Sequence, residues 1–302
     1  MSSTVQQKTL AVLATVICLL TLCLLFVGAM VTSTGSGLSV PDWPTTFGQN
    51  MYAYPLSEMR GGVVYEHSHR LFASAIGFLT IVLTLTVWLW ESRRWVKYLA
   101  LTELLLVCLQ GLLGGLTVKF KLPVAVSSAH AGVAELFFCG SIWLMWSMTA
   151  SWKKNAWKTN AHSRGAFALA TLVYVQILVG AVMRHSYAGL AIPTFPRAFD
   201  GWIPSFWSQG IFLNFLHTRI GALMVSIGSL ILISSLLRKS IANKFAWMLF
   251  GVLAVQVVLG VLTIWTVKVP WIASLHLACG ALLFGTLITI ALWSGKQDGA
   301  TA

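Results

Sequence analysis

Charged side chains are scarce in this sequence. Only 9% of its 302 residues are Asp, Glu, Lys or Arg, whereas 57% are hydrophobic and the mean hydropathy is +0.81. Because a soluble domain carries about 25% charged residues, this composition excludes an ordinary globular protein. A net charge of +12 would indicate nucleic acid in a soluble chain. Here the basic residues cluster in short loops between apolar runs, so we expect the lipid bilayer as the partner and no nucleic acid.

Cysteine patterns typical of metal sites or disulfide frameworks are also missing. No CxxC spacing occurs, and every cysteine falls within an apolar stretch and not in a loop. We therefore expect neither a structural zinc site nor a disulfide framework. The five side chains are predicted to be buried thiols: Cys18, Cys23, Cys108, Cys139 and Cys279.

Long apolar runs are abundant. A transmembrane helix needs about 20 predominantly apolar residues, and eight stretches of the chain meet this requirement. The sequence therefore predicts an all-α polytopic membrane protein with eight transmembrane helices. The predicted spans are residues 10–32, 67–90, 97–118, 124–149, 165–184, 211–237, 245–267 and 271–293.

The loop charges predict the orientation. Lys and Arg in short loops mark the cytoplasmic side, and they are twice as frequent on one side of the predicted spans as on the other. We expect both termini in the cytoplasm and the protein in the cell inner membrane. The cytoplasmic set is Lys8, Arg93, Arg94, Lys97, Lys153, Lys154, Lys158, Arg164, Arg238, Lys239, Lys244 and Lys296, against Arg60, Lys119, Lys121, Arg184, Arg197 and Lys268 outside.

The chain also contains an internal repeat. The outer-loop segment GLSVPDWPTTF at 37–47 aligns with GLAIPTFPRAF at 189–199, and QGLLGGLT at 110–117 aligns with QVVLGVLT at 256–263. We predict two tandem four-helix bundles, residues 1–155 and 156–302, related by a pseudo-twofold axis along the membrane normal. Halves with an even number of spans enter the membrane in the same direction, which disfavours inverted-repeat transporters but leaves parallel-repeat ones open.

Four histidines follow this repeat. His69 and His130 in the first half correspond to His217 and His276 in the second, at offsets of 148 and 146 residues. All four are predicted about two turns inside the outer end of an even-numbered span, where an ionisable residue is a functional hypothesis by default. Two imidazoles at matched depth can bind one haem iron from both sides. A zinc or copper site is the alternative, but it would need further ligands that the sequence does not place near each pair.

Other polar residues accompany the histidines. Arg70 and Arg219 either extend to the lipid headgroups or bind haem propionates through the forked guanidinium. Glu66 lies one helical turn before His69, on the same face, whereas Asn214 holds the matching place before His217. This asymmetry indicates one reactive site and one electron-carrying site, and it makes Glu66 the candidate catalytic residue. The roles of Glu135, His67 and His185 stay open.

Together these features resemble the haem A synthase family. The resemblance covers nearly the whole chain, and its most specific part is Glu66-x-x-His69-Arg70 with His130, His217 and His276. It implies oxidation of a methyl group of haem O to a formyl group with oxygen from water, making haem A for terminal oxidases. It also implies substrate haem between His69 and His130 near Glu66, and a haem b cofactor (iron) between His217 and His276. Haem O synthase and a membrane electron acceptor are the implied partners, and the haem sites are implied near the periplasmic face.

The sequence departs from the family pattern at one place. Many members carry two cysteines in the first outer loop, but Val40 and Thr46 stand at these positions here, with Ile192 and Ala198 as their counterparts in the second half. We expect no loop disulfide and no thiol-dependent step. Two other functional classes stay open from the residues alone: a b-type cytochrome that acts as a membrane electron carrier or quinol oxidoreductase, and a parallel-repeat transporter of haem or a small metabolite.

Overall fold

The computed structural model describes the chain except for residues 1–2, 150–151, 153–156, 239–242 and 298–302. Within the described ranges it is all-helical, with no β-strand beyond two isolated bridges. Eight helices are long and apolar enough to cross a membrane, which confirms the predicted all-α membrane fold. Their elements are α1 (Ser3–Ser33), α2 (Gly62–Trp90), α3 (Arg94–Lys119), α4 (Val124–Ser147), α6 (Ala161–His185), α7 (Gln209–Phe215) continuing through a π-helix (Leu216–Gly221) into α8 (Ala222–Leu237), α9 (Asn243–Trp265) and α10 (Pro270–Gln297).

Most helices extend beyond the predicted apolar spans. The helix α2, for example, begins at Gly62 and not at residue 67. Apolar runs end where polar residues begin, but the backbone hydrogen bonds of a helix continue through polar residues as well. As a result Glu66 and His67 are helical and buried, which places the Glu66 side chain one turn from His69.

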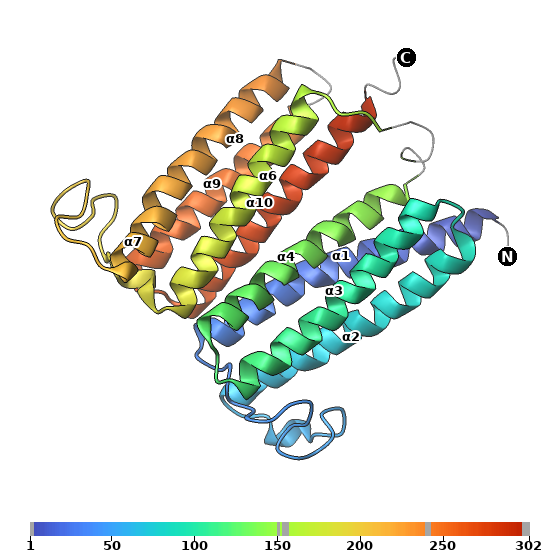
Figure 1. Ribbon diagram of the computed structural model, residues 1–302, viewed down its shortest axis with the longest axis horizontal. Coiled ribbons are helices and arrows are strands. Elements are labelled where there is room, and N and C mark those ends of the chain that lie inside the picture. The colour runs from blue at the N-terminus through green and yellow to red at the C-terminus, as the bar shows by residue number, and fades with distance from the viewer. Residues whose placement is uncertain (1–2, 150–151, 153–156, 239–242, 298–302) are drawn as a thin grey trace.

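The helices form two groups of four, α1 to α4 and α6 to α10 (Figure 1). The two long loops, residues 34–61 and 186–208, lie at one end of the molecule, whereas the start of α1 and the end of α10 lie at the other (Figure 1). Which end faces the cytoplasm stays a prediction. The predicted boundary at 155/156 lies outside the described residues, as do Lys153, Lys154 and Lys239.

The helix α10 is the most deeply packed element. In its membrane-spanning window 61% of residues are buried, against 17–44% in the other seven, because α10 contacts α6, α9, α1 and α4. The two groups meet through α1 and α4 on one side and α6 and α10 on the other. A shared core cluster includes Phe138 and Ile142 of α4 together with Leu283 and Leu287 of α10.

The outer surface of the bundle is apolar. Large side chains such as Phe78 and Ile231 are about two-thirds exposed, as expected for helices whose outer faces meet lipid tails. The prediction that all cysteines are buried was wrong for Cys23 and Cys108, which are exposed. A hydrophobic span does not distinguish the inner face of a helix from its lipid face, because both are apolar.

Candidate functional site

Each of the four repeated histidines lies against a glycine of the preceding long helix. His69 contacts Gly28 of α1, and His217 contacts Gly180 of α6; a Cβ at these glycines would lie 3.0 and 2.6 Å from the rings. The second pair of contacts is His130 with Gly114 and His276 with Gly260, at 3.4 and 3.0 Å. At Gly180 a side chain would force the ring to move, at Gly28 and Gly260 it would be tight, and at Gly114 it would make ordinary contact. The rings lie 6 to 8 residues from the starts of their helices, or about 9–12 Å at 1.5 Å per residue.

The histidines of the second half face one another. The ring centroids of His217 and His276 are 6.4 Å apart and the ring planes are perpendicular, at 87°. The Nδ1 atom of His217 lies 3.2 Å from the carbonyl oxygen of Gln176, and a hydrogen bond there leaves Nε2 free to bind a metal. The side chain of Gln176 in turn donates to the backbone carbonyl of His217. His217 is therefore held by Gln176 of α6 at two points, the ring through Nδ1 and the backbone through the carbonyl oxygen.

The first half repeats this arrangement in part. His69 lies near His130, and the Gln110 side chain donates to the backbone carbonyl of His130 at 2.9 Å. Nowhere in the described part of the chain do three His, Cys, Asp or Glu side chains gather as a metal site. The donor set is thus paired imidazoles, which does not support the zinc or copper alternative.

The guanidinium of Arg70 braces the first outer loop. Its Nη1 donates to the carbonyl oxygens of Asp42 and Thr45, at 2.7 and 3.1 Å. Its Nη2 donates to the carbonyl of Val40 and forms an ion pair with Glu66 at 2.5 Å. Both terminal nitrogens of the Arg70 guanidinium therefore have hydrogen-bond partners within the protein. The propionate contact predicted for Arg70 would have to come from Nε or replace one of these bonds.

Glu66 belongs to the same brace. The side chain is 4% exposed, and its second carboxylate oxygen accepts a hydrogen bond from the backbone N–H of Val40 at 2.8 Å. The side chain is thus a buried carboxylate with a fixed cationic partner, one turn from His69. The sequence predicted its position beside His69 but not its contacts with the loop, because the loop conformation is not visible in a local pattern.

The second half has a matching brace in which Arg219 takes the place of Arg70. Nη2 of Arg219 donates to the carbonyls of Thr194 and Arg197, the counterparts of Asp42 and Thr45. Asn214 replaces Glu66, and its amide donates to the carbonyls of Ala188 and Gly189. Nε of Arg219 is buried and makes no hydrogen bond with the described residues. It is therefore a donor that a bound carboxylate could satisfy.

The π-helix explains a difference in spacing between the two braces. Arg70 directly follows His69, whereas Arg219 comes two residues after His217. The π-helix at Leu216–Gly221 accommodates one additional residue within the helix. That extra residue brings Arg219 back under its loop while His217 keeps its place on the ring-binding face.

The four positions at which cysteines are absent are buried beneath the loops. Val40, Thr46, Ile192 and Ala198 are each 0–1% exposed. The hydroxyl of Thr46 lies 3.1 Å from Nδ1 of His67, a fully buried residue whose ring also packs against Tyr54. The first loop is held by packing and by Arg70, and His67 contributes to that packing.

Comparison with known proteins identifies the family. Residues 11–288 match the COX15-CtaA family, described as cytochrome oxidase assembly protein. The chain belongs to this family.

Relatives named heme A synthase are similar over most of their length. The protein of Shouchella clausii is 31% identical over 221 residues, which cover 70% of each chain. That of Halalkalibacterium halodurans is 28% identical over 277 residues, covering 88% of this chain and 90% of the relative. That of Rhizobium etli is 27% identical over 323 residues, covering 90% and 86%. The family resemblance predicted from the histidines is confirmed.

A polar contact between the two halves was not predicted from the sequence. Nη2 of Arg184, near the end of α6, donates to the carbonyl of Ala29 at 2.8 Å and to the hydroxyl of Ser33 in α1. Ser33 also lies 2.9 Å from the hydroxyl of Ser274 in α10. His185 follows Arg184 and lies near enough to His130 for an electrostatic interaction. The sequence feature that could have indicated this contact is Arg184 itself, because basic residues are less frequent on the predicted outer side of the membrane.

Proposed function

We propose that this protein is a haem A synthase: a membrane enzyme that oxidises a methyl group of haem O to a formyl group. Membership of the family and the names of its relatives support the reaction. The observation that carries the proposal for the residues is the pairing of repeated histidines with a carboxylate, Glu66, in one half only. In the other half an amide, Asn214, stands at the same place.

The second half fits a resident haem b. A metal–imidazole bond is about 2.0–2.1 Å long and the bonded nitrogen lies about 1 Å from the ring centre, so two rings that bind one iron have centres roughly 6 Å apart. The observed separation of His217 and His276 is 6.4 Å. Gly180 and Gly260 leave room for the rings, and the unpaired Nε–H of Arg219 is available to a propionate. A haem with two histidine ligands supplies reversible one-electron transfer.

The first half, assigned to residues 1–155, binds the substrate in this proposal. His69 and His130 hold the iron of haem O, and its apolar tail extends into the lipid. The half at 156–302 carries the cofactor. Both sites lie near the periplasmic face of the inner membrane, where the long loops cover them. Haem O synthase delivers the substrate, and an electron acceptor in the membrane takes the electrons.

The substrate reaction sets the role of Glu66. Each hydroxylation adds the oxygen of one water to the methyl carbon and releases two electrons and two protons. Two such steps give a geminal diol, which loses water to become the aldehyde. The carboxylate of Glu66, held by Arg70 and the N–H of Val40, stabilises the positive charge that develops on the substrate or accepts a proton from the attacking water, as a positioned general base does.

Replacing Glu66 with glutamine tests this role. Glutamine keeps the size of the side chain and an oxygen that accepts from the N–H of Val40, but it removes the charge. We expect Glu66→Gln to retain haem b and to accumulate haem O or the singly hydroxylated haem, with at least about a hundred-fold loss of rate. The assay is extraction and chromatography of the haems after expression with haem O synthase. Glu58→Gln, the same chemical change at an exposed residue of the first outer loop, is the control and should leave haem A formation intact. Full haem A production by Glu66→Gln would remove Glu66 from the mechanism.

A further inference from the structure

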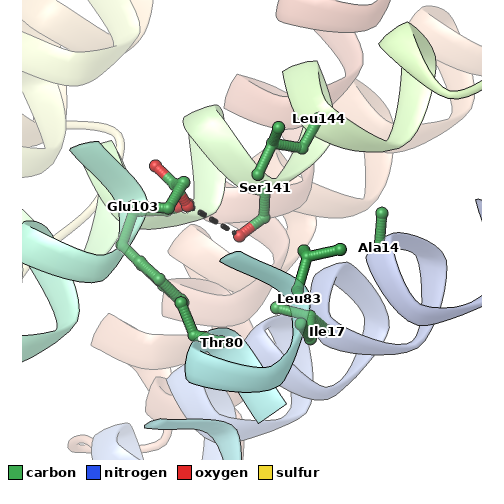
Figure 2. A pocket seen from close by; sticks show the side chains of 8 residues that line it. Ala14, Ile17, Thr80, Leu83, Glu103, Ser141 and Leu144 are labelled. Atoms are coloured by element: carbon green, nitrogen blue, oxygen red, sulfur yellow. Dashed lines mark hydrogen bonds between the residues drawn. The ribbon is translucent and has the colours of Figure 1, made fainter. Parts of the chain in front are cut away.

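A second carboxyl group lies in the interior of the first half, far from Glu66. Glu103 of α3 is 2% exposed and stands nine residues after Arg94, about 13–14 Å along the helix. Figure 2 shows it beside Ser141 of α4, at a small cavity lined also by Thr80 of α2 and by apolar side chains of α1, α2 and α4. The cavity volume is about 10 Å³, close to the minimum that admits one water molecule.

The hydrogen bonds around Ser141 are compatible with a protonated Glu103. The hydroxyl of Ser141 lies 2.9 Å from the carbonyl oxygen of Phe137 and 3.1 Å from Oε2 of Glu103. A serine hydroxyl has one hydrogen to donate, and a carbonyl oxygen can only accept. Ser141 either shares its one hydrogen between the two oxygens or donates it to Phe137 while a protonated Glu103 donates to Ser141. The second arrangement gives each contact a hydrogen of its own.

The surroundings of Glu103 also favour the neutral form. The ion pairs of the described residues are Arg70–Glu66 and Arg93–Glu91, so Glu103 has no cationic partner. Its Oε1 is buried without a hydrogen-bond partner and lies against the backbone of Gly140. Cys18 of α1 and Cys139 of α4 interact electrostatically with Glu103, and neither is basic. An unpaired charge inside a bilayer is costly, so the proton is retained at rest.

The repeat shows that the fold does not need this carboxyl group. The offset of 146 residues that relates His130 to His276 places Leu249 at the position of Glu103 and Leu287 at that of Ser141. Both leucines are fully buried. The same offset places Ala281, also buried, at the position of Glu135, whose Oε2 is a second buried atom without a partner. The helices α6 to α10 contain no Asp or Glu at all, so every intramembrane carboxyl group lies in the half assigned to the substrate.

We propose that Glu103, with Glu135 between it and His130, carries protons from the substrate site toward the inner end of the first four helices. The inference rests on the proposed function, because oxidation of a methyl group by water releases two protons with each pair of electrons. The electrons pass to the membrane acceptor, and the protons need an exit. Glu135 lies five residues beyond His130 and Ser141 lies six beyond Glu135, steps of about 8–9 Å along α4. These steps are longer than a direct hydrogen bond, so the proposal requires a water molecule at each one. The electron-transferring half releases no protons and has no such groups.

Three variants of the full-length, haem-loaded protein test the proposal. Glu103→Gln keeps the shape but cannot release a proton, Glu103→Leu copies the second half, and Glu58→Gln makes the same chemical change on an exposed loop as the control. We expect Glu103→Gln and Glu103→Leu to slow conversion of haem O to haem A at least about ten-fold. Haem b content and its absorption spectrum should stay unchanged, and Glu58→Gln should convert at the wild-type rate.

Two further measurements separate proton transfer from helix packing. The infrared carbonyl band of protonated carboxylic acids should shift when the wild-type protein is moved into D₂O. The difference between the wild-type and Glu103→Gln spectra should contain the band of Glu103. Glu103→Leu should unfold at a temperature equal to or above that of the wild type, whereas a carboxyl group that only joins α3 to α4 would make it less stable. Wild-type conversion rates in both Glu103 variants, a band that does not exchange, or a less stable Glu103→Leu would each overturn the inference. If the wild type makes no haem A, the proposed function fails separately, and the D₂O measurement still decides whether Glu103 exchanges its proton.

Discussion

The glycine at position 180 gives a sharp test of how the second histidine pair is built. A Cβ at Gly180 would lie 2.6 Å from Cε1 of His217, whereas ordinary contact begins at 3.4 Å. Gly180→Ala must therefore displace the ring or the helix by about 0.8 Å. Overpacking of this kind typically costs about 1–3 kcal/mol, which corresponds to a roughly 5- to 150-fold weaker affinity for haem b.

The assay is the haem b content and the reduced-minus-oxidised absorption spectrum of the purified variant. Gly260→Ala, with its Cβ 3.0 Å from His276, should lose less haem than Gly180→Ala. Gly251→Ala is the matched control, because its Cβ would meet nothing within 4 Å on a helix of the same half, and it should retain full haem b. A Gly180→Ala protein with wild-type haem content and spectrum would refute the reasoning that this glycine makes room for the ring.

Two further predictions concern the outer loops. Arg219→Ala removes the donors that hold the carbonyls of Thr194 and Arg197, and it also removes the free Nε–H. We expect faster protease cleavage of the loop at 186–208 and loss of haem b during purification. Unchanged haem retention would count against a propionate contact. In the first loop, desolvation acts to raise the pKa of Asp42, but hydrogen bonds from the Thr45 hydroxyl and the N–H groups of Phe47 and Gly48 outweigh it and hold that pKa below its usual value. A lowered pKa in the folded state stabilises the loop above the unfolded value of about 3.9 and loses that contribution as the pH falls through the folded value. The protection of the Phe47 and Gly48 amides, measured as the exchange rate relative to the intrinsic rate at each pH, should therefore fall below about pH 4 in the wild type. This fall should be absent in Asp42→Asn, and equal pH profiles of protection in the two proteins would contradict the assignment.

The contacts between the outer loops and the helices were the hardest features to predict. The spacing of Glu66 and His69 placed both on one face of α2, but the sequence did not show that Glu66 also binds Val40 and Arg70. Those partners come from 26 residues upstream and from the next turn, and their meeting depends on how the loop at 34–61 folds over the helix. For the same reason the arginines were assigned to propionates or headgroups, whereas the structure uses their terminal nitrogens to hold the loops.

The sequence by itself determined the membrane class, the eight spans, the repeated histidines and the family. Each of these depends on the chemical nature of residues along the chain: apolar runs are long enough to cross lipid, and duplicated positions keep the same side chain. Only the tertiary structure decided which glycine lies against which imidazole, that Arg184 joins α6 to α1, and that Glu103 lies buried beside Ser141 with no cation. These contacts join helices that are distant in sequence, and in a uniformly apolar span nothing local marks which face of a helix meets its neighbour and which meets lipid.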